Sequence, residues 1–127
     1  MGVFHIDCDV LRIGRKARPE RVRRALVDTG SELSWIPADI LRRAGIQISK
    51  RDQPFVMANG QTITRHIGYA MLRASGFETV DEVVFAQPGD QALLGARTLE
   101  GFGVRVDPRR HRLVGSGPAP AAPGDAR

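Results

Sequence analysis

The segment Ala25-Leu26-Val27-Asp28-Thr29-Gly30-Ser31 is an apolar run that ends in a carboxylate, a hydroxyl and a glycine. A strand that leads directly into a tight glycine turn holds such a carboxylate at a fixed place and angle. Asp28 is therefore a candidate acid–base residue, because catalysis by a carboxylate depends first on its position. The chain holds only one such segment. If Asp28 is catalytic, we expect a second carboxylate to come from a second copy of the chain.

The overall composition is that of one globular domain. The chain has 127 residues, of which 42% are hydrophobic and 26% are charged. No apolar run approaches the roughly 20 residues of a membrane helix, and the first residues lack the pattern of a signal peptide. The single cysteine, Cys8, excludes an internal disulfide and fits a reducing compartment. We therefore expect a cytoplasmic protein with no membrane partner, in which Cys8 packs as a small apolar residue.

The net charge is +5 and comes from arginines that occur in several short groups, interspersed with acids. A basic protein can bind nucleic acid. However, the sequence has no recognition-helix pattern and no aromatic pair at an RNA-binding spacing. A solvated arginine-rich surface is the stronger interpretation, and a nucleic-acid-associated domain ranks lowest among the functions considered.

The order of apolar and turn-forming residues predicts an all-β domain over residues 1–115 with one or two short helices. The alternation of apolar residues and the Asn59-Gly60 turn indicate short strands and a hairpin, and a closed barrel is the natural architecture. Residues 116–127 are rich in Gly, Pro and Ala and predict a disordered tail. The expected strands are 3–13, 22–27, 67–74, 79–85, 104–106 and 112–114, the hairpin is 55–64, and the helices are 38–44 and 96–100, the second ended by Gly101.

The quartet Asp28-Thr29-Gly30-Ser31 resembles the active-site signature of aspartic proteases. Trp35-Ile36-Pro37 is similar to the continuation found in pepsin-like enzymes, and Leu93-Leu94-Gly95 follows at the expected distance. The length is that of retropepsin-like (clan AA) single-domain members of the bacterial or cellular type, which act as homodimers. Over residues 3–114, this resemblance implies a closed retropepsin-like acid-protease barrel that cleaves a peptide or protein substrate without a cofactor.

The resemblance also implies roles for the residues of the signature. Two Asp28 side chains that face each other across a dimer axis cannot both ionise, so they share one proton and activate a water between them. Thr29 is expected to hydrogen-bond across the axis, and Gly30 to allow close approach of the backbone. Ser31 is expected to bind substrate and to donate its hydroxyl to the outer oxygen of Asp28. We therefore assign Asp28, Thr29 and Gly30 as catalytic.

The hairpin around Asn59-Gly60 corresponds to the flap that closes over an extended substrate in such proteases. The resemblance therefore implies that Met57, Ala58, Asn59 and Gly60 bind substrate. By itself, the same pattern indicates an ordinary surface hairpin first. Its position between the Asp28 loop and Leu93-Leu94-Gly95 is what favours the flap.

Three questions stay open at the level of sequence. Glu32 occupies a position that pairs with an arginine in viral members, but the nearest arginine here, Arg97, comes one place late, so the pair is either rebuilt or absent. Trp35 either lines the substrate groove or fills the core, and packing is the commoner role. The chain is either an endopeptidase or a non-proteolytic protein-interaction dimer with the same fold. The histidines lack the spacing of metal ligands, so we expect no metal site.

Overall fold

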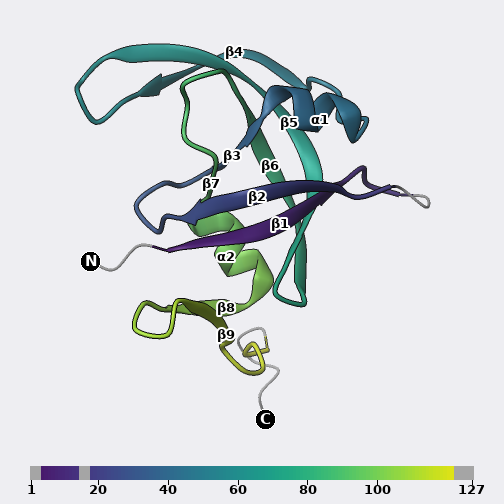
Figure 1. Ribbon diagram of the computed structural model, residues 1–127, viewed down its shortest axis with the longest axis vertical. Helices are drawn as coiled ribbons and strands as arrows, with labels where there is room; N and C mark the ends of the chain where they lie inside the picture. The colour runs from purple at the N-terminus through teal and green to yellow at the C-terminus, as the bar shows by residue number, and fades with distance from the viewer. Residues whose placement is uncertain (1–3, 15–17, 122–127) are drawn as a thin grey trace.

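The larger of two β-sheets contains seven strands and closes on itself (Figure 1). The computed structural model describes residues 4–14 and 18–121, which form a mostly β fold with two short helices. The strands are β1 (His5–Leu11), β2 (Glu20–Val27), β3 (Ser34–Pro37), β4 (Lys50–Val56), β5 (Thr62–Ala74), β6 (Phe77–Ala86), β7 (Leu93–Leu94), β8 (Val104–Asp107) and β9 (Arg112–Gly115); the helices are α1 (Ala38–Arg43) and α2 (Ala96–Phe102). The prediction of strands with two short helices is confirmed.

The strand order of the larger sheet is β1-β2-β7-β3-β6-β5-β4, and β1 also pairs with β5. Six strands therefore form a ring, and β4 lies outside it with β5 as its only partner in the sheet. The short strand β7 runs parallel to β2 and antiparallel to β3. Because β7 lies between β2 and β3, the end of β2 and the adjoining Asp28 lie beside Leu93 and Leu94.

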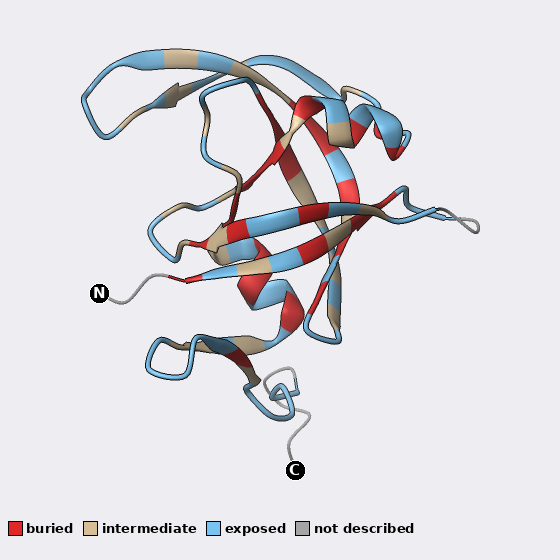
Figure 2. Ribbon diagram, viewed as in Figure 1, coloured by how far each residue is buried: buried red, intermediate tan, exposed pale blue. Residues whose placement is uncertain are grey.

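The main core combines buried residues from the strands of the ring with residues of α1, α2 and β9. Along the ring strands, alternate residues contribute to it. On β1, Cys8 and Val10 are buried whereas His5 and Asp7 are exposed, as the alternation predicts (Figure 2). Burial also raises the pKa of the Cys8 thiol to about 12, which fits a packing role. A second, smaller apolar cluster is formed by Trp35, Ile67, Val84, Ala86 and Leu93.

The second helix does not end where the sequence predicts. Gly101 lies within α2, and the helix ends at Phe102, followed by Gly103, whose φ of 71° is left-handed. A glycine is required at position 101 for a different reason, because a Cβ there would lie 2.2 Å from Oγ1 of Thr79 on β6. The glycine therefore allows close packing of α2 on the sheet. The first helix matches the prediction to within one residue, and Gly45 follows it with φ of 81°.

The predicted hairpin joins β4 to β5 and projects from the rest of the molecule (Figure 1). The Met57 amide donates to the Gln61 carbonyl, and Asn59 accepts the Gln61 amide on its side-chain oxygen, which shapes the tip. β5 is one strand of 13 residues where the sequence predicts a hairpin arm and a separate strand. β4 begins at Lys50, earlier than predicted. Its first residues are polar and exposed, so they lack the apolar alternation that predicts a strand.

The smaller sheet pairs β8 with β9 and lies beside α2 (Figure 1). The side chain of Asp107 accepts the amides of Arg109 and Arg110 in the turn between β8 and β9. Residues 116–121 are exposed and form neither helix nor strand, and the remainder of the expected tail, 122–127, lies outside the described residues. Among the described residues, neither helix has the length and apolar character needed to cross a membrane.

Candidate active site

Asp28 lies directly after β2, in a turn that its own side chain stabilises. The Gly30 amide donates to Oδ1 of Asp28 at 2.9 Å, and the Ser31 amide lies 3.3 Å from the Asp28 carbonyl oxygen. A carboxylate that accepts the amide two residues ahead forms an Asx turn, which fixes its rotamer. Asp28 is partly buried, whereas Thr29 and Gly30 are exposed. The turn therefore presents the Asp28 carboxylate at the surface in a defined orientation.

The segment Leu93-Leu94-Gly95 packs against the backbone of this turn. The Asp28 amide donates to the Leu94 carbonyl at 3.0 Å, and the Ala96 amide donates to the Ser31 carbonyl at 2.7 Å. Gly95 fits closely, since a Cβ there would lie 2.5 Å from the Leu33 carbonyl oxygen and 2.8 Å from that of Ser31. The residues on both sides of the turn are therefore fixed by the backbone of β7 and α2.

A buried polar network, which the sequence does not reveal, continues from Gly95. Ser34 and Thr98 are both fully buried, and their hydroxyl oxygens are 2.6 Å apart. The Gly95 amide donates to Oγ of Ser34, and Thr98 donates to the carboxylate of Asp81 at 3.0 Å. Because the hydroxyl hydrogen of Thr98 is used in the bond to Asp81, the Ser34 hydroxyl is the donor to Thr98. Ser34 lies in an apolar run before Trp35, and such an isolated hydroxyl is the only signal in the sequence.

A groove of about 580 Å³ separates the Asp28 turn from the β4–β5 hairpin. The predicted residues Asp28, Gly30, Ser31, Met57 and Ala58 line it. The other predicted residues, Thr29, Asn59 and Gly60, are exposed and do not line it. The remaining lining residues are Glu32, Leu33, Trp35, Lys50, Gln53, Phe55, Val56, Ile67, Glu82, Leu93 and Arg97. The groove thus joins residues of the Asp28 turn to residues of the hairpin.

The structure corrects the predicted contact of Ser31 and answers the open question about Trp35. The Ser31 hydroxyl donates to the Leu33 carbonyl at 2.9 Å, so the predicted bond from Ser31 to the Asp28 carboxylate is wrong for the single chain. Trp35 is 8% exposed, stacks at an angle on Phe55 with ring centres 5.1 Å apart, and lines the groove. Its two proposed roles are therefore compatible.

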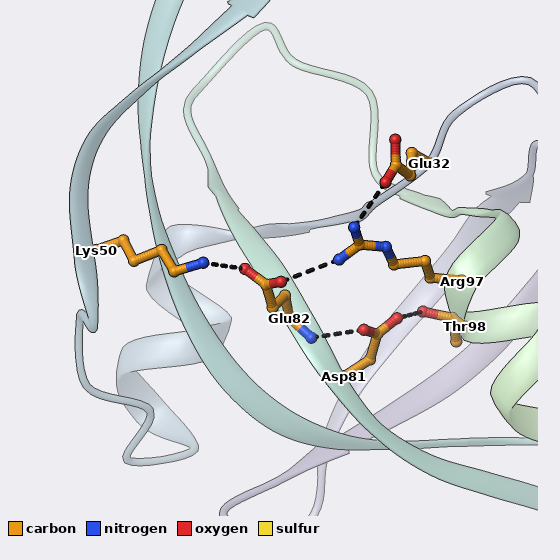
Figure 3. A network of polar contacts seen from close by, with 6 residues as sticks. All are labelled: Glu32, Lys50, Asp81, Glu82, Arg97 and Thr98. Atoms are coloured by element: carbon orange, nitrogen blue, oxygen red, sulfur yellow. Dashed lines mark hydrogen bonds and ion pairs between the residues drawn. The ribbon is translucent and has the colours of Figure 1, made fainter.

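A chain of ion pairs among Glu32, Arg97, Glu82 and Lys50 lines the groove (Figure 3). Arg97 contacts Glu32 at 2.7 Å and Glu82 at 2.9 Å, and Glu82 contacts Lys50 at 2.9 Å. The pair between Glu32 and Arg97 is therefore present, although Arg97 comes one place late in the sequence, because it lies in the first turn of α2 beside the Glu32 carbonyl. The Lys50 hydrogen bond is the main reason that the pKa of Glu82 lies below its ordinary value.

The charges along the groove distinguish Asp28 from the other acids. Glu32 and Glu82 both pair with Arg97, whereas Asp28 has no basic partner among the described residues. In the part of the chain that the structure describes, no three His, Cys, Asp or Glu residues are placed to hold a metal ion. The groove therefore contains one carboxylate that is oriented by the backbone and is not neutralised by a cation.

The comparison with protein families agrees with this geometry. A family model described as "gag-polyprotein putative aspartyl protease" matches residues 20–101, from the start of β2 to α2. This range contains the Asp28 turn, the β4–β5 hairpin and the Leu93-Leu94-Gly95 segment. No curated protein matches the chain.

Proposed function

Because the chain belongs to the retropepsin-like family of gag-polyprotein aspartyl proteases, we propose that it is an aspartic endopeptidase whose site is completed by a second copy of the chain. One observation carries the proposal. Asp28, held by the Gly30 amide and by the Leu94 carbonyl, lies in a groove roofed by the β4–β5 hairpin. Each chain supplies one such carboxylate, and peptide hydrolysis by this chemistry requires two.

In the proposed dimer, two Asp28 carboxylates face each other and share one proton. The ionised carboxylate takes a proton from a water as the water oxygen attacks the carbonyl carbon of the scissile bond. The protonated carboxylate gives its proton to the carbonyl oxygen, which produces a tetrahedral diol. As the carbon–nitrogen bond breaks, the diol returns a proton to the dyad, and a carboxyl group protonates the leaving amine.

The neighbours of Asp28 have roles in this proposal. Thr29 is exposed beside the turn, where its hydroxyl is available to a partner subunit. Gly30 leaves room at the turn, since a Cβ there would lie 3.2 Å from Oδ1 of Asp28. Met57, Ala58, Asn59 and Gly60 form the tip of a flap that closes over an extended peptide, with Ser31 on the floor of the groove. The apolar side chains around Trp35 favour apolar residues in the substrate.

The direct test compares the wild type with Asp28→Asn on a mixed peptide pool between mildly acidic and neutral pH. Asparagine retains Oδ1, so it still accepts the Gly30 amide and the fold should be unchanged. We expect the wild type to cleave, with a bell-shaped pH profile and inhibition by a statine-type peptide. Asp28→Asn should retain its circular dichroism spectrum and lose all cleavage.

Two results would change the assignment. Full activity in Asp28→Asn would exclude this mechanism. A wild-type chain that binds peptides without cleaving any would support the alternative, a non-proteolytic interaction dimer that uses the same groove.

A further inference from the structure

The β4 strand, which carries one side of the hairpin, has few attachments to the rest of the molecule. It pairs only with β5, and its ladder is interrupted between Lys50 and Gln53, where β4 contains one residue more than β5. Asp52 in this bulge has a left-handed φ of 53°. Lys50 lies at the root of the hairpin, before the bulge, and beyond the bulge the backbone of β4 pairs with β5. The position of the hairpin relative to the other side of the groove therefore depends on side-chain contacts.

Two side-chain contacts connect β4 to the other wall of the groove. Phe55 packs on Trp35, and Lys50 reaches Glu82 on β6 at 2.9 Å. The second contact crosses β5, because β4 and β6 flank β5 on opposite sides at this point. Lys50 pairs in register with Ile67 of β5, which in turn pairs with Val84 of β6. Since alternate residues share a face, Lys50 and Glu82 lie on the same face of these three strands.

Glu82 connects this contact to the catalytic loop. One of its oxygens accepts from Lys50 and the other from Arg97, and Arg97 also bonds Glu32, four residues after Asp28 (Figure 3). The Glu82 side chain is 19% exposed, so its pairs are better shielded from water than an ordinary surface pair. Loss of its charge would leave the cations of Lys50 and Arg97 close together without the shared anion.

We propose that Lys50, Glu82 and Arg97 are positioning residues, which fix the root of the hairpin to the Asp28 loop and so set the width of the groove. The kinetic part of this inference rests on the proposed peptidase function, whereas the mechanical part does not. A substrate must be clamped between the hairpin and the loop, so a looser root should weaken substrate binding more than it slows the chemical step.

The test uses Glu82→Gln, with Asp9→Asn as the matched control. The control removes an acid of similar exposure, 22%, from its ion pair with Arg21, which lies on β1 and β2 away from the groove. Amide hydrogen exchange of Ser49 and Met57 reports on the hairpin, because both amides are hydrogen-bonded across it. We expect exchange at these amides to become about fivefold faster in Glu82→Gln, the size of one surface ion pair, and to stay unchanged in Asp9→Asn.

The kinetic measurement separates positioning from general stability. Glu82→Gln should raise KM about fivefold and leave kcat nearly unchanged, as should Lys50→Met, whereas Lys50→Arg should restore the wild-type KM. Hairpin exchange and KM that are equal in Glu82→Gln and Asp9→Asn would overturn the proposal. If the wild type cleaves no peptide but Glu82→Gln still loosens the hairpin, the peptidase function fails and the mechanical inference stands.

Discussion

Gly95 is the residue whose identity the geometry of the site restricts most directly. It is buried between β7 and α2, and an added methyl group would lie 2.5–2.8 Å from the Leu33 and Ser31 backbone. Backbone atoms cannot rotate away as a flexible side chain can. A larger residue must therefore displace the loop that carries Asp28.

Gly95→Ala is predicted to lower the free energy of unfolding by about 2–3 kcal/mol, the cost of an overpacked site. It should also reduce peptide cleavage more than its stability loss explains, because the Asp28 loop moves. Urea unfolding followed by Trp35 fluorescence measures the stability. Gly115→Ala is the control, since its Cβ would meet Phe77 at an ordinary 3.8 Å, and it should change stability by less than about 0.5 kcal/mol. Equal stability of the two variants would contradict this account of Gly95.

The sequence predicts Asp28 and its supports because these positions depend on local patterns. An apolar strand, an Asx turn and a glycine are recognisable from neighbouring residues alone. The network of Ser34, Thr98 and Asp81 is different, because its members lie 17 to 64 residues apart and meet only in the folded chain. The sequence predicts the wrong acceptor for the Ser31 hydroxyl for a different reason, because the direction of the Leu33 carbonyl, two residues away, depends on the path of the loop backbone.

At the scale of elements, the loop between β6 and β7 is attached to the hairpin by one well-shielded ion pair. Arg65 of β5 donates to both carboxylate oxygens of Asp90, at 2.7 and 2.9 Å, and Asp90 also accepts the Gln87 amide. The Arg65 hydrogen bonds are the main reason that the pKa of Asp90 lies below its ordinary value, although burial opposes them. The pair therefore contributes stability that depends on pH.

Asp90→Asn is predicted to destabilise the protein by about 1–2 kcal/mol at neutral pH and by progressively less in acid. Because the pKa of Asp90 is lower in the folded chain, its contribution is complete above the unfolded value, near 3.9, and is lost as pH falls through the folded value. Urea unfolding over a pH series measures the difference from wild type. Glu100→Gln, which alters an exposed carboxylate on α2, is the control and should follow the wild-type profile. A difference for Asp90→Asn that does not change with pH would contradict the assignment.

The element boundaries that the sequence misses are set by tertiary packing. Gly101 is a usual helix terminator, yet α2 continues to Phe102 because that ring is buried against the core. Residues 62–66 belong to the same strand as residues 67–74 because they pair with β4, although the pairing with β6 begins at Ile67. For α2 the local signal is overruled by core residues that are distant in sequence, whereas β5 is extended by β4, its neighbour in the hairpin.

At the scale of the whole molecule, the single Asp28 of each chain makes the proposed activity a property of a pair. A two-fold dimer would place equivalent groups on both sides of the scissile bond. We propose that the first strand and residues 112–114 form the contact between the two chains; residues 112–114 belong to β9, which lies in the small sheet outside the ring. The mostly β fold follows from short alternating segments, whereas an assembly of two chains follows only from the missing carboxylate.

Mixing experiments test this dependence on a partner. A tenfold excess of Asp28→Asn, equilibrated with the wild type, is predicted to reduce wild-type activity to about a tenth, because nearly all wild-type chains then occupy mixed dimers. Peptide cleavage at constant wild-type concentration measures the effect, with an equal excess of an unrelated protein as the control. Activity that is unaffected by the variant would indicate that each chain works alone.

The most direct measurement is a crystal structure of the chain with a statine-type peptide bound in the groove. The account predicts two chains related by a two-fold axis around one peptide, with both Asp28 carboxylates within about 3 Å of the statine hydroxyl. The account would be contradicted by a peptide bound to one chain alone, or by two Asp28 carboxylates too far apart to contact the same hydroxyl.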